Sequence, residues 1–365
     1  MHDIFGTRFV GARIPAWHHI GTVIQNPEEV TIGEMLKVGG IDYLYQSAPI
    51  GFTSPSGNFV GSKKVAVLRS PVDGETEWVE LGIVSEGYRY LQNEELARGL
   101  DAVARETGWT FETVGALANG AQIFMTLSMG GISIKGDELN QYLIVSDGKA
   151  SGRSLQVSIA TERVVCRNTL LAADASATTM IKIAHDAEVA NNYGFWTEYI
   201  ADFKSGRERT IEELNRMADV RVTLAQAQEI IAAAFPLPKP NAKAKQAQEI
   251  ADDPKVSVEM KERALERLLP GTVSYQYEVD ATEKKRAGAL ELLGRFNDGA
   301  EQGGSMAPDA LAALAGTGYA VLQAVTEVVD WAGAAPAAGA AGSALFGDGA
   351  IQKRRAWEAA LAVAN

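Results

Sequence analysis

The residues best suited to do chemistry lie in "TERVVCRNTL", residues 161 to 170, where the chain's only cysteine stands between two arginines. Arg163 and Arg167 are four positions apart, which places both side chains on one face of either a strand or a helix begun at Thr161. Two guanidinium groups on one face are planar, permanently charged donors that suit phosphate oxygens. They could equally pair with carboxylates of the same protein. Phosphate contact and internal ion pairing therefore both stay open.

Cys166 lies between these arginines and invites a second interpretation. Neighbouring positive charges favour the thiolate form, which is the form that attacks electrophiles. However, no histidine is near in sequence, and the preceding Val164 and Val165 are typical of a buried strand or helix. We therefore expect Cys166 to be a small packing residue, and we predict that the protein is not an enzyme.

Positive charge is concentrated around this stretch. The chain has 34 Lys and Arg against 46 Asp and Glu, so its net charge is 34 − 46 = −12. From residue 149 to residue 167 the count is instead 4 − 1 = +3, from Lys149, Arg153, Arg163 and Arg167 against Glu162. Such segregation can mark a local nucleic-acid contact in a chain that would not coat nucleic acid as a whole.

A second cluster combines aromatic and basic residues. In "SEGYRYLQN", Tyr88, Arg89 and Tyr90 alternate, so both tyrosines would point to one side of a strand and could stack on unpaired bases. Tyrosines at such a position also commonly belong to the core or its rim. Lys63 and Lys64 on a neighbouring predicted hairpin could extend a basic strip, or could simply protect an exposed strand edge.

Other common sites lack support. His18, His19 and His185, with one cysteine, do not form a zinc-binding pattern, so we predict no metal site and no cofactor. The chain contains no GxxxxGK[ST] phosphate loop, no GxGxxG after a strand, no HExxH and no GxSxG. The usual signatures of nucleotide hydrolases, dehydrogenases, zinc proteases and serine hydrolases are therefore missing.

The elements that must position these residues follow from local patterns. Residues 41 to 160 contain short runs rich in branched and aromatic residues, separated by turn sequences, with one amphipathic helix after Asn93. Helical periodicity dominates after residue 170. We predict an α+β fold in which a helix backs an antiparallel β-hairpin sheet and a largely helical C-terminal half follows. The expected domains are a core at 1–180, a helical region at 181–300 with a proline-rich break near 236–240, and C-terminal helices with a Gly/Ala-rich linker at 301–365.

Composition bears on the setting of the protein. Of the 365 residues, 46% are hydrophobic, but no apolar run approaches the roughly 18 to 20 residues that a membrane span requires. The N-terminus lacks the pattern of a signal peptide, and one cysteine cannot form an intramolecular disulfide. We expect a cytoplasmic protein that is not inserted in a membrane.

Several stretches together resemble a known family. "IPAWHHIGT", "LGIVSEGYRYLQNEE", "FETVGALANGAQIFMTL", "ERVVCRNTL", "KIAHDAE" and "GTGYAVLQAVTEVVDW" occur in this order. They resemble the phage/plasmid-like proteins defined by a domain of unknown function, family 932. The chain departs from that pattern at Ala16, which separates Pro15 from Trp17, and at Gln323 and Trp331. The resemblance implies a setting in phages, plasmids or prophages, and it implies no established activity.

The basic residues and this resemblance together lead to a functional hypothesis. We expect a protein that binds and anneals single-stranded DNA in replication or recombination, in the host-cell cytoplasm, as a homo-oligomer that could form a ring. Phosphate contacts would come from the lysines and arginines named above, and base contacts from Tyr88 and Tyr90. The alternative is a non-enzymatic interaction or scaffold protein that binds a protein partner through its acidic helical half.

Overall fold

A computed structural model describes residues 4–12, 21–26, 30–149, 154–163, 180–183, 185, 196, 199–298, 308–331 and 348–365. The chain forms two compact units. The first unit contains the described residues of Met1–Asn215, Gly303–Ala310 and Ala335–Ala350, and the second contains those of Arg216–Gln302, Leu311–Ala334 and Ile351–Asn365. This differs from the predicted three consecutive segments, because helices from the last part of the chain pack against earlier ones.

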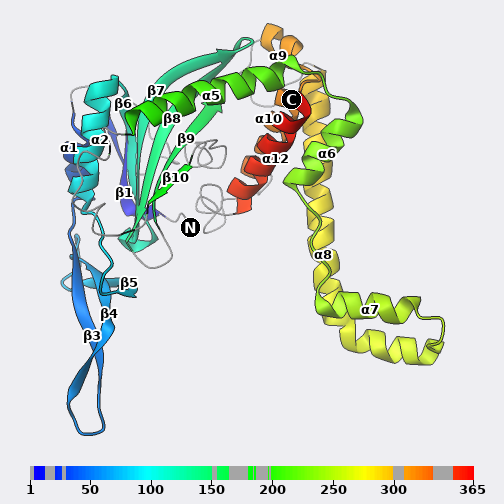
Figure 1. The fold of residues 1–365 in the computed structure, drawn as a ribbon, viewed down its shortest axis with the longest axis horizontal. Helices are drawn as coiled ribbons and strands as arrows, with labels where there is room; N and C mark the ends of the chain where they lie inside the picture. The colour runs from blue at the N-terminus through cyan, green and yellow to red at the C-terminus, as the bar shows by residue number, and fades with distance from the viewer. Residues whose placement is uncertain are drawn as a thin grey trace. The chain divides into compact units, whose positions relative to one another are not determined.

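A seven-stranded sheet forms the centre of the first unit, in the order β10-β9-β8-β7-β6-β1-β2 (Figure 1). Its strands are β1 (Ile4–Ala12), β2 (Thr22–Ile24), β6 (Thr110–Leu117), β7 (Gln122–Ile134), β8 (Asp137–Gly148), β9 (Leu155–Arg163) and β10 (Met180–Ile183). All neighbours are antiparallel except β1 and β2, which are parallel. The expected antiparallel hairpins are thus confirmed from β7 to β9.

Helices cover one face of this sheet. They are α1 (Ile32–Val38), α2 (Asn93–Thr107) and the beginning of α5 (Ile200–Asp219). Leu96, Leu100 and Val103 recur at helical spacing on α2 and join a core with the inward residues of the strands. The prediction of a helix that backs the sheet is confirmed. The helix includes Asn93 and does not begin after it: Gln92 is the N-cap residue, and Asn93 donates from Nδ2 to the Ile41 carbonyl at 2.7 Å.

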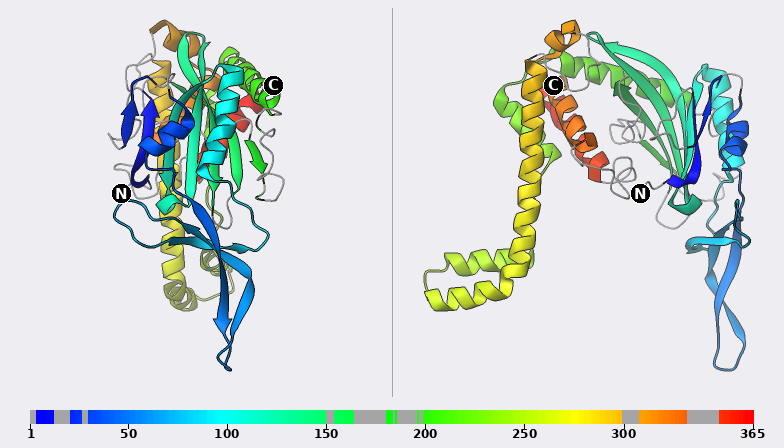
Figure 2. Two further views of the ribbon diagram at one scale, coloured as in Figure 1. Left: turned by 90° about the vertical axis from the view of Figure 1, so that its left-hand side faces the viewer. Right: turned by 180° about the vertical axis from the view of Figure 1, so that it is seen from behind.

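A second, three-stranded antiparallel sheet in the same unit has the order β3-β4-β5. Its strands are β3 (Tyr45–Thr53), β4 (Phe59–Arg69) and β5 (Val79–Ser85). The distal part of the β3–β4 hairpin extends well beyond β5 and makes a free-standing two-stranded arm (Figures 1 and 2). The short helix η2 (Ala118–Gly120), which joins β6 to β7, lies next to the base of this sheet.

Helices make up the second unit, as predicted for the C-terminal half. They are α6 (Leu224–Ala234), α7 (Ala242–Asp252), α8 (Val258–Asn297) and α10 (Gly318–Trp331), while α9 (Pro308–Leu314) and α12 (Asp348–Ala364) contribute their later residues. The proline-rich break is confirmed between Ala234 and Ala242. Helix α8 continues through Pro270.

The long helix α8 has two arms. Its N-terminal arm forms a hairpin with α7, and its C-terminal arm packs against α6 and α10. The ribbon bends sharply where the hairpin meets the long arm (Figure 1). Pro270 lies inside α8 and accounts for a bend, because proline removes a backbone donor and its ring crowds the preceding turn. Among all helices that the structure describes, none is both long and apolar enough to span a bilayer.

Candidate nucleic-acid interface

Three of the predicted basic residues come together at the base of the projecting hairpin. Lys64 of β4 is paired with Ser85 at the end of β5, and the Lys63 carbonyl accepts from the Glu86 backbone N–H at 3.1 Å. The Arg89 guanidinium donates to the Glu86 carbonyl at 3.3 Å, so it lies beside the same turn. Lys63, Lys64 and Arg89, which we call the basic corner, are all exposed and form no ion pair with any described residue.

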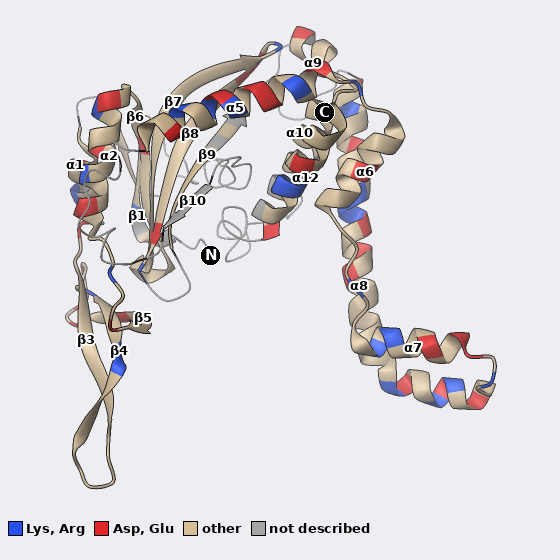
Figure 3. Ribbon diagram, in the orientation of Figure 1, with Lys and Arg blue, Asp and Glu red and all other residues tan. Residues whose placement is uncertain are grey.

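The β3–β4 hairpin, which carries Lys63 and Lys64 of the basic corner, contains no acidic residue. Residues 43–72 contain no Asp or Glu, although the chain as a whole has 46 of them (Figure 3). The basic residues in this interval are Lys63, Lys64 and Arg69. A segment without negative charge in a strongly acidic protein is suited to approach an anion, because no carboxylate on it has to be brought close to phosphate.

Two phenylalanines are exposed near the tip of the hairpin. Phe52 is 62% exposed and Phe59 is 64% exposed. The register pairs Phe52 with Val60 and Thr53 with Phe59, so the two rings are on opposite faces of the ribbon. Gly51 leaves room for the Phe59 ring, since a Cβ there would lie 2.5 Å from it. The tip therefore presents an aromatic ring on each face, and no local sequence pattern indicated this.

The lysines lie where the β3–β4 ladder is interrupted. The register shifts here: Pro49 and Gly51 are two positions apart on β3, whereas their partners Val65 and Gly61 are four positions apart on β4. The additional β4 residues, which include Lys63 and Lys64, form a bulge, and bulges bend a strand and redirect its side chains. This irregularity separates the arm that bears the rings from the basic corner.

A buried arginine anchors the hairpin to the large sheet. Arg69, at the end of β4, is fully buried and makes a two-fold contact with the Glu75 carboxylate at 2.8 and 2.9 Å. Its Nε also donates to the Asn119 carbonyl of η2 at 3.1 Å. The Phe5 ring lies 4.6 Å from the Arg69 guanidinium carbon and 4.4 Å from that of Arg8. Arg69 therefore serves as a structural tie and is not presented to a ligand.

Contacts with Arg69 also set the ionisation of its acidic partner. The hydrogen bond from Arg69 lowers the pKa of Glu75 to about 2, with help from the Val72 backbone N–H. Burial works in the opposite direction on the nearby tyrosine and raises the pKa of Tyr43 to about 12. Glu75 is thus charged and Tyr43 neutral near neutral pH, which keeps a guanidinium–carboxylate pair at the base of the hairpin.

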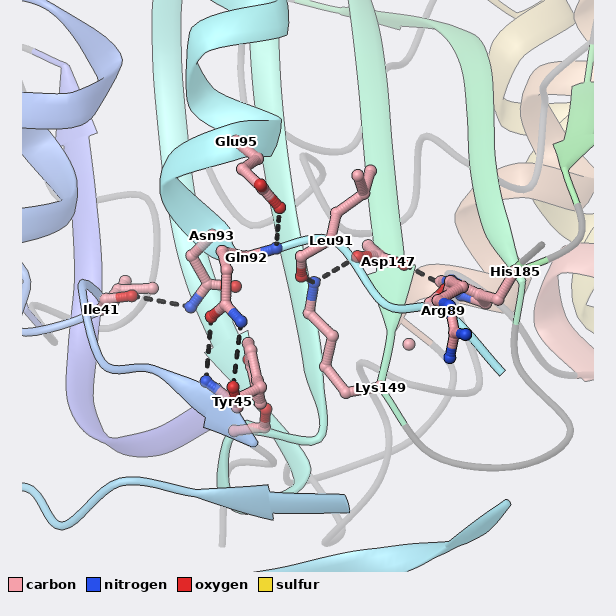
Figure 4. Close-up of polar contacts among 12 residues, drawn as sticks. Ile41, Tyr45, Arg89, Leu91, Gln92, Asn93, Glu95, Asp147, Lys149 and His185 are labelled. Atoms are coloured by element: carbon pink, nitrogen blue, oxygen red, sulfur yellow. Dashed lines mark hydrogen bonds and ion pairs between the residues drawn. The ribbon is translucent and has the colours of Figure 1, made fainter. Parts of the chain in front are cut away.

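The structure corrects the expected role of Lys149. Its ammonium group is fully buried at the end of β8, forms an ion pair with Asp147, and donates to the Leu91 carbonyl at 2.7 Å (Figure 4). It also lies 4.9 Å from the centre of the Tyr45 ring. Because every side of the ammonium faces protein, Lys149 does not contact a phosphate backbone in this arrangement. The positive charge counted here in the sequence is neutralised internally.

Asp147 links this lysine to a histidine that is distant in sequence. His185 Nε2 lies 3.1 Å from Asp147 Oδ1, and His185 Nδ1 lies 3.0 Å from the Arg89 carbonyl. Burial alone would raise the pKa of Asp147, but the charges of Lys149 and His185 outweigh it and hold the pKa below its ordinary value. The cluster ties the loop that bears Arg89 to the end of β8, and it thereby fixes where Arg89 lies in the basic corner.

The tyrosines of "SEGYRYLQN" are also placed differently from the prediction. β5 ends at Ser85, so Tyr88 and Tyr90 lie in the connection to α2 and not on a strand. The Tyr88 hydroxyl donates to the Gly148 carbonyl at 2.9 Å, and its ring packs 4.7 Å from that of His185. The Tyr90 ring meets that of Tyr45 edge-on at 6.0 Å. Both rings pack against the core, so neither is an open platform for a base.

The remaining predicted residues lie mostly outside the described part of the chain. This applies to Arg153, Cys166 and Arg167, and to His18 and His19. The backbone of Arg163 is described as the last residue of β9, paired with Leu139. The chain is therefore extended through residues 161–163, which rules out a helix that begins at Thr161. No group of three or more potential metal ligands occurs among the described residues.

The fold and site define an α+β protein with a basic, aromatic hairpin and a helical second unit. The chain belongs to the family described as a domain of unknown function (DUF932), whose model matches residues 80–344. This match includes the Asp147 cluster and Arg89 and begins after the β3–β4 hairpin. No curated protein and no solved structure matches the chain significantly.

Proposed function

We propose that the protein binds single-stranded DNA and promotes its annealing, as a homo-oligomer in the cytoplasm of the host of a phage or other mobile element. It would act in recombination or replication, without a catalytic cofactor. The observation that carries this proposal is the acid-free β3–β4 hairpin, with an exposed phenylalanine on each face and three exposed cations at its base. Unpaired bases offer the flat apolar surfaces that such rings stack on, while phosphates attract the cations.

The arrangement favours single strands over duplexes. Paired bases are stacked within a duplex and expose only their edges, so a ring at the tip of a narrow arm has no base face to contact. In a single strand the bases can turn out toward Phe52 and Phe59 while the backbone follows the basic corner. Contacts of this kind tolerate any base, so we expect little sequence preference, as annealing of arbitrary strands requires.

The test is a titration of labelled oligo(dT) at several salt concentrations with four proteins. The wild type is compared with Lys63→Ala/Lys64→Ala, with Phe52→Ala/Phe59→Ala, and with the matched control Lys245→Ala/Lys284→Ala, which removes two exposed lysines from the second unit. Each phosphate contact contributes about 0.7 to the slope of log affinity against log salt for single strands, so the first variant should lower the slope by about 1.4. The phenylalanine variant should lose about 1–3 kcal/mol for each ring that stacks on a base.

Two outcomes would reject the proposal. One is a wild type that does not bind oligo(dT) even at low salt. The other is binding that the lysine and phenylalanine variants weaken no more than the control does, because the contact would then lie away from the hairpin.

A second candidate function has its own supporting observation. Val258, Met260, Leu269, Val273 and Tyr277 are exposed apolar residues of α8, and exposed apolar residues on one element are typical of protein-binding surfaces. A non-enzymatic interaction or scaffold protein would use them to hold a protein partner. In that case oligo(dT) binding is absent, and substitutions on α8 abolish capture of the partner.

A further inference from the structure

An apolar and acidic surface surrounds the bend of α8. Leu265 and Leu269 precede the bend and Val273 and Tyr277 follow it, each four positions from the next, and all are exposed, up to 76% for Tyr277. Residues four apart on a helix are neighbours on its surface. Apart from the break in direction near Pro270, these side chains form one series around the bend.

Carboxylates accompany the apolar residues on this side of the helix. At 100° per residue, Glu262 and Glu266 fall within about 60° of Leu269, whereas Arg267 falls on another side. Both glutamates are exposed, and neither forms an ion pair with any described residue. We call Glu262, Glu266, Leu265, Leu269, Val273 and Tyr277 the acidic elbow.

The composition of the acidic elbow limits what can cover it. A second acidic elbow would bring glutamates of two copies together, and like charges at an interface are unfavourable. A suitable occupant offers exposed apolar side chains, positive charge and no carboxylate. The β3–β4 hairpin has these three properties, in Phe52 and Phe59, in Lys63 and Lys64, and in the absence of Asp and Glu from residues 43–72.

We propose that the acidic elbow of one copy binds the β3–β4 hairpin of a second copy. The two surfaces are different, so the contact is head-to-tail, and repetition gives a ring if the rotation closes and a filament if it does not. This deepens the proposed self-association and names its two surfaces. Because the hairpin is also the proposed DNA contact, the acidic elbow covers it until a single strand displaces the neighbouring copy.

The test measures mass by sedimentation velocity without nucleic acid, so its result does not depend on DNA binding. The elbow variant is Glu266→Lys/Leu269→Ser, and the hairpin variant is Phe52→Ser/Phe59→Ser. A matched control, Glu229→Lys/Leu224→Ser, makes the same two changes at exposed positions of α6. Wild type and control should associate as concentration rises from micromolar to hundreds of micromolar, and each of the two variants alone should associate at least tenfold more weakly.

Mixing gives the decisive result. An elbow variant keeps a working hairpin and a hairpin variant keeps a working elbow, so an equimolar mixture should form a heterodimer and nothing larger. If the hairpin variant does not fold, Lys64→Glu replaces it, and Glu266→Lys in the other copy should restore the association that each single reversal weakens. A wild type that stays monomeric, an elbow variant that behaves like the control, or a mixture without heterodimer would overturn the proposal.

Discussion

Replacement of Lys149 by methionine separates a structural cation from a DNA-binding one. The ammonium group and the Asp147 carboxylate are both fully buried, so the substitution leaves a buried carboxylate without its lysine partner. Removal of one partner from a buried ion pair typically costs about 3–5 kcal/mol of unfolding free energy, much of it from the charge that stays behind. We expect Lys149→Met to destabilise the first unit by that amount.

Calorimetry of the whole protein, read at the thermal transition of the first unit, measures this loss of stability. A unit of this length shifts its melting temperature by about 2–4 °C per kcal/mol, so the expected decrease is about 6–20 °C. The double variant Asp147→Leu/Lys149→Met should recover part of the loss, because it leaves no uncompensated charge. As a control, Lys245→Met removes a lysine that is 74% exposed and should change the free energy by less than about 0.5 kcal/mol.

The same variant is then tested for oligo(dT) binding below its melting temperature. Affinity and salt slope should equal those of the wild type, since the Lys149 ammonium does not reach solvent. The reasoning would be refuted by a Lys149→Met protein that melts within about 3 °C of the wild type and also loses part of its salt slope. That combination would mean that the lysine is exposed and contacts phosphate.

Two further predictions concern the base of the hairpin and the packing of α2. The lowered pKa of Glu75 contributes stability that is fully present above pH 4.5, its ordinary pKa, and is lost as the pH falls toward about 2. Glu75→Gln should therefore make the melting temperature less dependent on pH across this interval and leave its pH dependence elsewhere unchanged. A variant with the same acid profile as the wild type would contradict the Arg69–Glu75 tie. Gly99 of α2 faces Trp196, whose ring would lie 2.1 Å from an added Cβ, so Gly99→Ala should destabilise the protein by about 1–3 kcal/mol in chemical denaturation. Gly294→Ala is the matched change in an open helical position and should stabilise by up to about 1 kcal/mol; equal effects at both sites would rule out the close packing.

Much of the fold follows from local sequence patterns. Short runs rich in branched and aromatic residues, separated by turn sequences, predicted the strands now seen as β3, β4, β5, β7, β8 and β9, and helical spacing predicted α2 and the helical second half. Such patterns work because the side-chain period of a strand or helix decides which residues can face a core. They do not show which strands become neighbours, so the separation into two sheets and the parallel β1–β2 pair were not predicted.

The candidate site was only partly predictable for the same reason. Lys63, Lys64 and Arg89 could be identified as basic residues near aromatic ones, and the absence of Asp and Glu from residues 43–72 can be counted in the sequence. The exposure of Phe52 and Phe59 could not be predicted, because phenylalanine is among the residue types that are most often buried. Lys149 shows the opposite error, since only the fold brings His185 and the Leu91 carbonyl to it and to Asp147.

The amino-acid sequence by itself determined the α+β class, the hairpin with its net positive charge, and the helical second half, because each depends on residues that are close along the chain. The tertiary structure decided which positively charged side chains are exposed to solvent and which are buried in contacts with other groups. Lys149 and Arg69 are each enclosed by a carboxylate that is near in sequence and by a carbonyl from a distant segment, whereas Lys63, Lys64 and Arg89 meet at a corner that faces solvent. The arginines beside Cys166 suggested a phosphate contact from the sequence. The fold adds a second candidate contact, the β3–β4 hairpin, because the exposure of its side chains depends on the packing of the whole chain.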